Sequence, residues 1–144
     1  MAIPETKSIT ENNKTITRRL IDEFWNQGNT DIAESLVAPE YERIELFTDE
    51  VTRGADGLKG AAAEWRGAFP DLALELKEIL AEDEKLACHW TFTGTHMGDL
   101  KGTPPTGKNV EVSGISILEF EDGKMTKEII STDLLSLMKQ LGVV

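Results

Sequence analysis

The sequence contains few of the residues on which common kinds of functional site depend. One cysteine, Cys88, and two histidines, His89 and His96, occur in 144 residues. One cysteine excludes an intramolecular disulfide, and two histidines with no His-x-x-Glu pair or Cys/His cluster give a metal site little support. The chain also lacks a P-loop, a GxGxxG after a strand and a GxSxG motif, which argues against phosphate, dinucleotide and serine-nucleophile chemistry. We therefore expect no metal and no cofactor.

Basic residues and long apolar runs are scarce as well. Fifteen Lys and Arg stand against 26 Asp and Glu, so the formal net charge is −11. This charge favours solubility and disfavours nucleic acid or an anionic membrane as a partner. No apolar run reaches 18 residues, and residues 1–7 lack the features of a signal peptide. We expect a cytoplasmic protein.

Length and composition are those of one compact domain. A chain of 144 residues has the commonest single-domain size and can bury a substantial core. Hydrophobic residues make up 40% and charged residues 28%, as in ordinary soluble proteins. We find no internal repeat, linker or low-complexity segment. These features predict a single domain over residues 1–144.

Three segments have the spacing of amphipathic helices. The first begins at a capping box formed by Ser8 and Glu11 and ends at Gly28. Its apolar residues recur at helical spacing: Ile9, Ile16, Leu20, Ile21, Phe24 and Trp25. A short second helix is predicted over 30–39, from the cap Thr30 to Pro39. The third covers 58–69 and contains several small residues, which would let it lie close to a sheet.

Most of the remaining chain alternates like β-strands. Tyr41–Phe47 reads as a strand, and Asp49–Gly57 as a loop. Further strands are predicted over 72–77, 86–95, 110–121 and 125–132, with a hairpin turn at Asp122-Gly123 and a helical turn or two after Leu134. This order predicts an antiparallel α+β domain rather than alternating βαβ units. Slips in the alternation at 77–80 and near Gly114 are candidate bulges of a strongly curved sheet.

The connection over residues 94–107 is rich in glycine and proline. Gly94, Gly98, Gly102 and Gly107 can adopt positive φ, while a Pro-Pro pair at 104–105 removes two backbone donors. It is therefore a shaped loop rather than a spacer. Such loops tend to border sites, although the residues alone fit an elaborate hairpin equally well.

Four segments together carry a family resemblance. The 94–107 loop resembles the GTH-x-G, G-x-PPTG pattern of SnoaL-like polyketide cyclases. Three further segments match this family in order and rough spacing: Phe69–Leu72, Asp122–Lys124 with the later Asp133, and Gln140–Gly142. The resemblance implies a curved antiparallel sheet wrapped around helices, an α+β cone of the nuclear transport factor 2-like (cystatin-like) type with an apolar cavity. It also implies a homodimer, formed through the outer face of the sheet.

Asp133 and His96 are the expected catalytic residues. From its position alone, Asp133 is either an N-cap for the segment at Leu134 or a partly buried carboxylate with a raised pKa. The family implies the second role, a general base that removes a proton next to a carbonyl and starts an intramolecular aldol closure. His96 shares a sheet face with Trp90 and Phe92, and could be a donor to the substrate or an anchor of the loop.

The expected ligand is a mostly apolar, cyclic or polyketide-like small molecule that carries a carbonyl group. Side chains predicted to bind it or line the cavity are aromatic and aliphatic: Trp90, Phe92, Trp25, Phe24, Tyr41, Trp65, Ile129, Leu74 and Leu76. Among these, Trp90, Trp25 and Tyr41 could donate hydrogen bonds to a developing enolate oxygen.

Departures from the family pattern leave other functions open. No His follows the segment at Tyr41, and Ile129 stands where a Trp is common. An isomerase of the ketosteroid type would have Tyr41 as its only tyrosine. An epoxide hydrolase of the limonene type would need an Asp-Arg-Asp set built around Arg43, Arg53 or Arg66. The last alternative is a non-catalytic small-molecule binding module.

Overall fold

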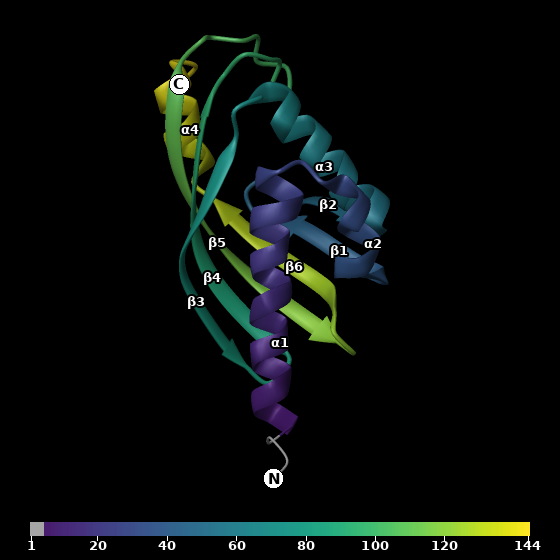
Figure 1. The fold of residues 1–144 in the computed structure, drawn as a ribbon. Helices are drawn as coiled ribbons and strands as arrows, with labels where there is room; N and C mark the ends of the chain where they lie inside the picture. The colour runs from purple at the N-terminus through teal and green to yellow at the C-terminus, as the bar shows by residue number, and fades with distance from the viewer. Residues whose placement is uncertain (1–4) are drawn as a thin grey trace.

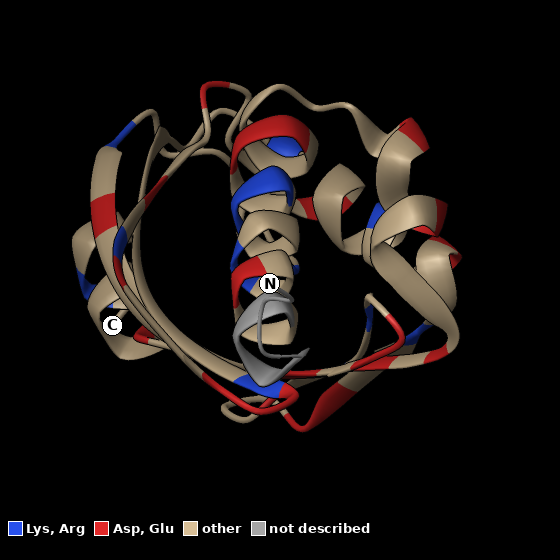
Figure 2. Cartoon of the chain, turned by 60° about the horizontal axis from the view of Figure 1, so that its bottom comes forward, with Lys and Arg blue, Asp and Glu red and all other residues tan. Residues whose placement is uncertain are grey.

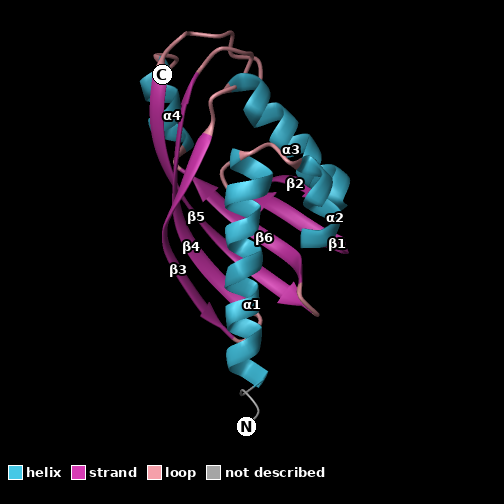
Figure 3. Ribbon diagram, in the orientation of Figure 1, coloured by secondary structure: helices cyan, strands magenta, loops and turns pink. Residues whose placement is uncertain are grey.

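The computed structural model describes residues 5–144, in which a curved sheet wraps around a long helix (Figure 1). The helical elements are α1 (Glu5–Arg19), the π-helical turn η1 (Leu20–Asn26), the 3-10 turn η2 (Thr30–Ile32), α2 (Ala33–Leu36), α3 (Gly54–Ala68) and α4 (Leu134–Leu141). The strands are β1 (Val37–Glu45), β2 (Glu50–Arg53), β3 (Ala73–Glu82), β4 (Lys85–Thr95), β5 (Asn109–Glu121) and β6 (Lys124–Thr132). Figure 3 shows the helices gathered mainly on the concave side of the strands. The predicted α+β fold with a curved, open sheet is confirmed.

The sheet has the strand order β2-β1-β6-β5-β4-β3. Four neighbouring pairs are antiparallel, and β1 pairs with β6 in parallel. The sequence did not predict this parallel pair. It is possible because α3 and four strands separate β1 from β6 along the chain, so the chain can return in the same direction. The pairing sets Arg43 beside Glu128.

The first helix is longer at its start than predicted. It begins at Glu5, so Ser8 lies inside α1 and the prediction that the helix starts at Ser8 is wrong. Glu and Lys residues favour helix, which lets it extend past a cap-forming serine. The predicted end is confirmed by Gly28, whose φ of 71° lies in the left-handed region. The helix lies over β3 and β4, with Leu20 and Phe24 buried.

Two boundaries differ from the prediction in the next segment. Val37 and Pro39 belong to β1 rather than to the second helix, which ends at Leu36. Pro39 is tolerated in the strand because the register with β6 shifts between Val37 and Glu42. The predicted loop 49–57 contains β2 and the first turn of α3. A strand of four residues flanked by turns gives too short an alternation to be recognised.

One of the two predicted bulges is present. The β3–β4 register shifts between Leu76 and Glu78, as expected, whereas no shift occurs at Gly114. Gly114 instead lies beneath the Trp90 ring, because a Cβ at this position would be 2.1 Å from Trp90 Cζ2. The glycine therefore makes room for an indole on the concave face.

The buried apolar side chains form one hydrophobic cluster between the concave face and the helices. Figure 2 shows Asp and Glu distributed over helices, strands and turns rather than gathered in one patch. Among the described helices, none is long and apolar enough to cross a membrane. On the outer face of the sheet, Ile115 and Ile117 remain 55% and 45% exposed.

Candidate functional site

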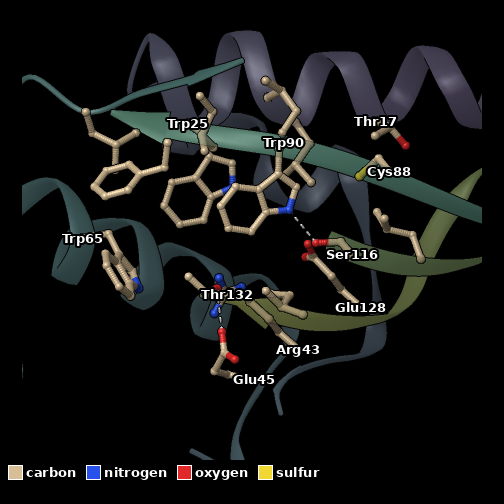
Figure 4. A pocket seen from close by; sticks show the side chains of 17 residues that line it. Thr17, Trp25, Arg43, Glu45, Trp65, Cys88, Trp90, Ser116, Glu128 and Thr132 are labelled. Atoms are coloured by element: carbon tan, nitrogen blue, oxygen red, sulfur yellow. Dashed lines mark hydrogen bonds between the residues drawn. The ribbon is translucent and has the colours of Figure 1, made fainter. Parts of the chain in front are cut away.

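A pocket opens on the concave face of the sheet, between the sheet and the C-terminal half of the first helix. One part of its wall is aromatic. Trp25 comes from η1, Trp65 from α3, and Trp90 and Phe92 from β4. The Trp65 ring packs edge-on against Phe92, with 6.0 Å between centroids. Figure 4 shows the side chains of Trp25 and Trp90 among those that line the pocket. This wall offers flat apolar surfaces to a ring system.

The indole nitrogen of Trp90 marks the border between the aromatic and the polar parts of the pocket. It donates a hydrogen bond of 3.0 Å to Ser116 Oγ on β5 (Figure 4). Glu128 on β6 also lines the pocket and is only 7% exposed. Its Oε1 accepts a hydrogen bond of 2.8 Å from the hydroxyl of Tyr41, which is fully buried behind it.

Arg43 and Glu45 from β1 complete the polar part. The Arg43 guanidinium carbon lies 5.8 Å from the centre of the Trp25 ring, within cation–π range. Its Nε is buried and has no hydrogen-bond partner among residues 5–144. Both oxygens of Glu45 are occupied: one accepts from Thr132 Oγ1 at 2.9 Å, the other from the Phe47 amide at 3.1 Å.

Burial keeps two further acids of this region protonated. It raises the pKa of Tyr41 well above its ordinary value, and the neighbouring Glu128 carboxylate adds to the effect. Burial also raises the pKa of the Cys88 thiol, from 9.0 to about 12, again with a contribution from Glu128. Both groups therefore remain neutral at physiological pH. In the described part of the chain, no three His, Cys, Asp or Glu residues are grouped so as to hold a metal ion.

Comparison with known proteins identifies the family. The model of the SnoaL-like polyketide cyclases matches residues 15–141, which is most of the chain. The chain belongs to the SnoaL-like polyketide cyclase family.

The chain is also similar to a curated cyclase and to two solved structures. The aklanonic acid methyl ester cyclase DauD of Streptomyces sp. strain C5 is 30% identical over 134 residues, covering 88% of this chain and 80% of DauD. TsrD of Streptomyces laurentii has a TM-score of 0.84 at 26% identity, covering 99% of this chain and 100% of TsrD. A Jannaschia sp. CCS1 protein whose structure is described as a "Putative SnoaL-like polyketide cyclase" has a TM-score of 0.87 at 23% identity, covering 100% and 99% of the two chains. The last likeness concerns the fold.

Asp133, the expected base of this SnoaL-like chain, lies outside the pocket. Its side chain is exposed and caps α4, accepting a hydrogen bond of 3.1 Å from the Ser136 amide. The capping role is therefore confirmed, and the expected burial beside Ile129 and the cavity aromatics is wrong. A carboxylate at the start of a helix is held by backbone N–H groups, which here turn it away from the apolar interior.

His96 also lies apart from the pocket, although it is fully buried. The Thr106 amide donates to its Nδ1 at 3.2 Å, and Thr106 Oγ1 lies 3.1 Å from the same atom. Its backbone bonds Lys108 and Gly107 across the loop. These bonds confirm that His96 anchors the 94–107 loop.

The pocket contains five of the expected lining residues and lacks four. Trp25, Trp65, Leu74, Trp90 and Phe92 line it. Phe24, Tyr41, Leu76 and Ile129 do not. For Ile129 the error is one residue, because Ile130 faces the pocket in its place. A shift of one residue exchanges the two faces of a strand.

The sequence interpretation missed most of the polar residues of the pocket and considered Arg43 only as part of an epoxide hydrolase set. The polar lining includes Arg43, Glu45, Ser116, Glu128 and Thr132. The available signal was the two-residue period of the strands: Arg43 and Glu45 share a face, as do Glu128, Ile130 and Thr132. Because Ile129 and Ile130 are adjacent, the apolar pattern alone did not decide which face of β6 points inward.

Proposed function

We propose that this chain is a polyketide cyclase, which binds an aromatic ester with several carbonyl groups and closes one ring by an intramolecular aldol reaction. The observation that carries the proposal is the division of the pocket into two parts. The tryptophans and Phe92 suit a flat ring system, and Arg43, Glu45 and Glu128 form an adjoining polar part, where acid–base chemistry can occur. Membership of the cyclase family supports the same reaction class.

The proposed reaction needs few protein groups. A base removes a proton from a carbon next to a carbonyl, and the resulting enolate attacks a second carbonyl of the same molecule. Positive charge or N–H donors near the enolate oxygen lower the barrier. The Arg43 guanidinium and the Ser116 hydroxyl are available for this role. The product is an isomer of the substrate, so no cofactor or second reactant is required.

The test uses the esters named for the curated relatives, aklanonic acid methyl ester and nogalonic acid methyl ester. Purified protein should convert at least one of them into a ring-closed isomer of unchanged mass, separated by chromatography. Leu74→Trp should block the pocket and abolish conversion. Leu80→Trp is the matched control, because Leu80 lies on the same strand but is 64% exposed. Tight binding of both esters without conversion would favour the non-catalytic binding module.

One observation favours a second candidate, the hydrolysis of an epoxide. Arg43 lines the pocket together with two carboxylates, Glu45 and Glu128, which is the acid–arginine–acid composition that such chemistry uses. Arg53 pairs instead with Glu42, and Arg66 donates to the Trp25 carbonyl. Formation of a diol from limonene epoxide, with no conversion of either ester, would select this candidate.

A further inference from the structure

We infer that Glu128 is the catalytic base of this pocket and that Tyr41 is its positioning residue. The inference rests on the proposed cyclase function and names the residue that performs its first step. Glu128 is 7% exposed, yet it lines the pocket. A carboxylate that is shielded from water and also reaches a ligand cavity can meet a substrate C–H group directly.

The contacts of Glu128 leave one oxygen available. Oε1 accepts the hydrogen bond from the Tyr41 hydroxyl at 2.8 Å. Oε2 accepts no hydrogen bond from the other residues of the described range, 5–144. Glu45 is the alternative carboxylate, but both of its oxygens already accept hydrogen bonds, from Thr132 and from the Phe47 amide. Glu128 therefore has a carboxylate oxygen that accepts no hydrogen bond from the described residues, whereas each oxygen of Glu45 already accepts one.

Tyr41 fixes the direction of this carboxylate. The phenol is fully buried, and its raised pKa keeps it a donor at all physiological pH values. The other charged or titratable groups facing Glu128 are Arg43 and Glu45 on β1 and Cys88 on β4. Arg43 is the register partner of Glu128, so the two side chains leave neighbouring positions of the sheet. Figure 4 shows the Glu128 side chain directed toward Ser116, beneath Trp90.

The step balances without any other reactant. Glu128 takes a proton from the carbon next to the ester carbonyl, and the C–H electron pair becomes the enolate. The enolate carbon forms a bond to the second carbonyl carbon, whose π electrons move to its oxygen. The resulting alkoxide then takes the proton from the Glu128 carboxylic acid. The carboxylate is regenerated, and substrate and product have the same composition.

Glu128→Gln is the decisive variant, because glutamine is nearly isosteric and still offers Tyr41 an acceptor. With aklanonic acid methyl ester, kcat should fall by about 10²–10⁴-fold, the usual contribution of a positioned base, while ester binding is retained. Glu121→Gln, at an exposed glutamate next to the β5–β6 turn, should keep the parental rate. Thermal unfolding of both variants identifies any loss of folding.

Two further measurements test Glu128 as the base and Tyr41 as its positioning residue. In deuterium oxide, the parent should exchange the acidic proton of a β-keto ester that cannot cyclise faster than buffer alone, and Glu128→Gln should exchange it no faster than buffer. Tyr41→Phe should move the acid limb of the kcat/KM profile to higher pH, because a carboxylate that loses a hydrogen-bond donor is protonated more readily. A purely structural tyrosine would leave this limb unchanged.

Each outcome bears on a different statement. Parental turnover by Glu128→Gln, or loss of turnover in Asp133→Asn alone, would overturn the assignment of Glu128 and leave the cyclase proposal intact. A parent that converts neither ester and exchanges no proton would overturn the assignment together with the proposed function.

Discussion

Adding a single methyl group at Gly114 should deform the pocket. In Gly114→Ala the new Cβ would lie 2.1 Å from Cζ2 and 2.3 Å from Cη2 of Trp90, whereas ordinary contact begins at 3.4 Å. The β-sheet backbone on both sides of Gly114 is paired, to Trp90 on β4 and to Thr132 on β6, so the indole must move rather than the strand. The space open to the indole is the pocket itself.

The expected loss of stability combines two effects. Overpacking in a well-packed region costs about 1–3 kcal/mol. Displacing the indole also breaks its 3.0 Å hydrogen bond to Ser116, with a net contribution of about 1 kcal/mol. Movement into the pocket relieves part of the strain, so we expect the free energy of unfolding to fall by about 2 kcal/mol in urea titrations. Affinity for aromatic esters should fall as well, because the ring then occupies their space.

The control is Gly60→Ala in α3, where an added Cβ has nothing within 4 Å. Alanine in a helix interior should raise stability there by up to about 1 kcal/mol. Trp90→Phe should restore part of the stability of Gly114→Ala, because a smaller ring leaves room for the methyl group. If Gly114→Ala unfolds at the parental urea concentration and binds esters normally, Trp90 does not occupy the place described above.

Three further predictions concern the cap, the outer sheet face and the thiol. Asp133→Ala should lower the free energy of unfolding by about 1 kcal/mol through loss of the N-cap, while Asp133→Asn should unfold near the parental temperature. Equal melting temperatures of the two variants would contradict the capping role. We propose a homodimer that forms through the outer face of the sheet, where the Ile117 side chain is 45% exposed in the single chain. Sedimentation should therefore give a dimer for the parent and a monomer for Ile117→Glu. A monomeric parent at micromolar concentration would refute the proposal. Because the pKa of Cys88 rises from 9.0 to about 12 on folding, the thiol is stabilised in its protonated form, and stability should decline as pH rises from 9 to 12. The decline should be shallower in Cys88→Ala, and parallel curves would show that the thiol does not titrate in this way.

The apolar part of the site could be predicted from the sequence because the local spacing of apolar residues indicates which side chains face the interior. Alternation along β4 correctly placed Trp90 and Phe92 on the inner face, and helical spacing placed Trp25. The motif in the 94–107 loop correctly indicated an ordered structure, and its histidine turned out to anchor that structure.

The polar part depends on long-range pairing, which local patterns do not contain. The parallel register of β1 with β6 brings Arg43 and Glu128 together, and no short segment encodes it. In addition, the adjacent Ile129 and Ile130 made either face of β6 look apolar. Asp133 was predicted to be a catalytic base because it follows a strand, but the same position precedes α4, where a helix cap is needed.

The parallel pair of β1 and β6 also has a consequence for the order of folding. The β3–β4 and β5–β6 pairs join strands adjacent in the chain, so they close short loops, whereas β1 and β6 are separated by most of the chain. Contacts between distant segments carry a larger loop-closure entropy and form more slowly. Trp90 and Phe92 on β4 can thus be positioned early by neighbouring hairpins. The acid and the guanidinium of the pocket meet only when β1 pairs with β6, so a nascent chain has no complete site until residues after the β5–β6 turn are available.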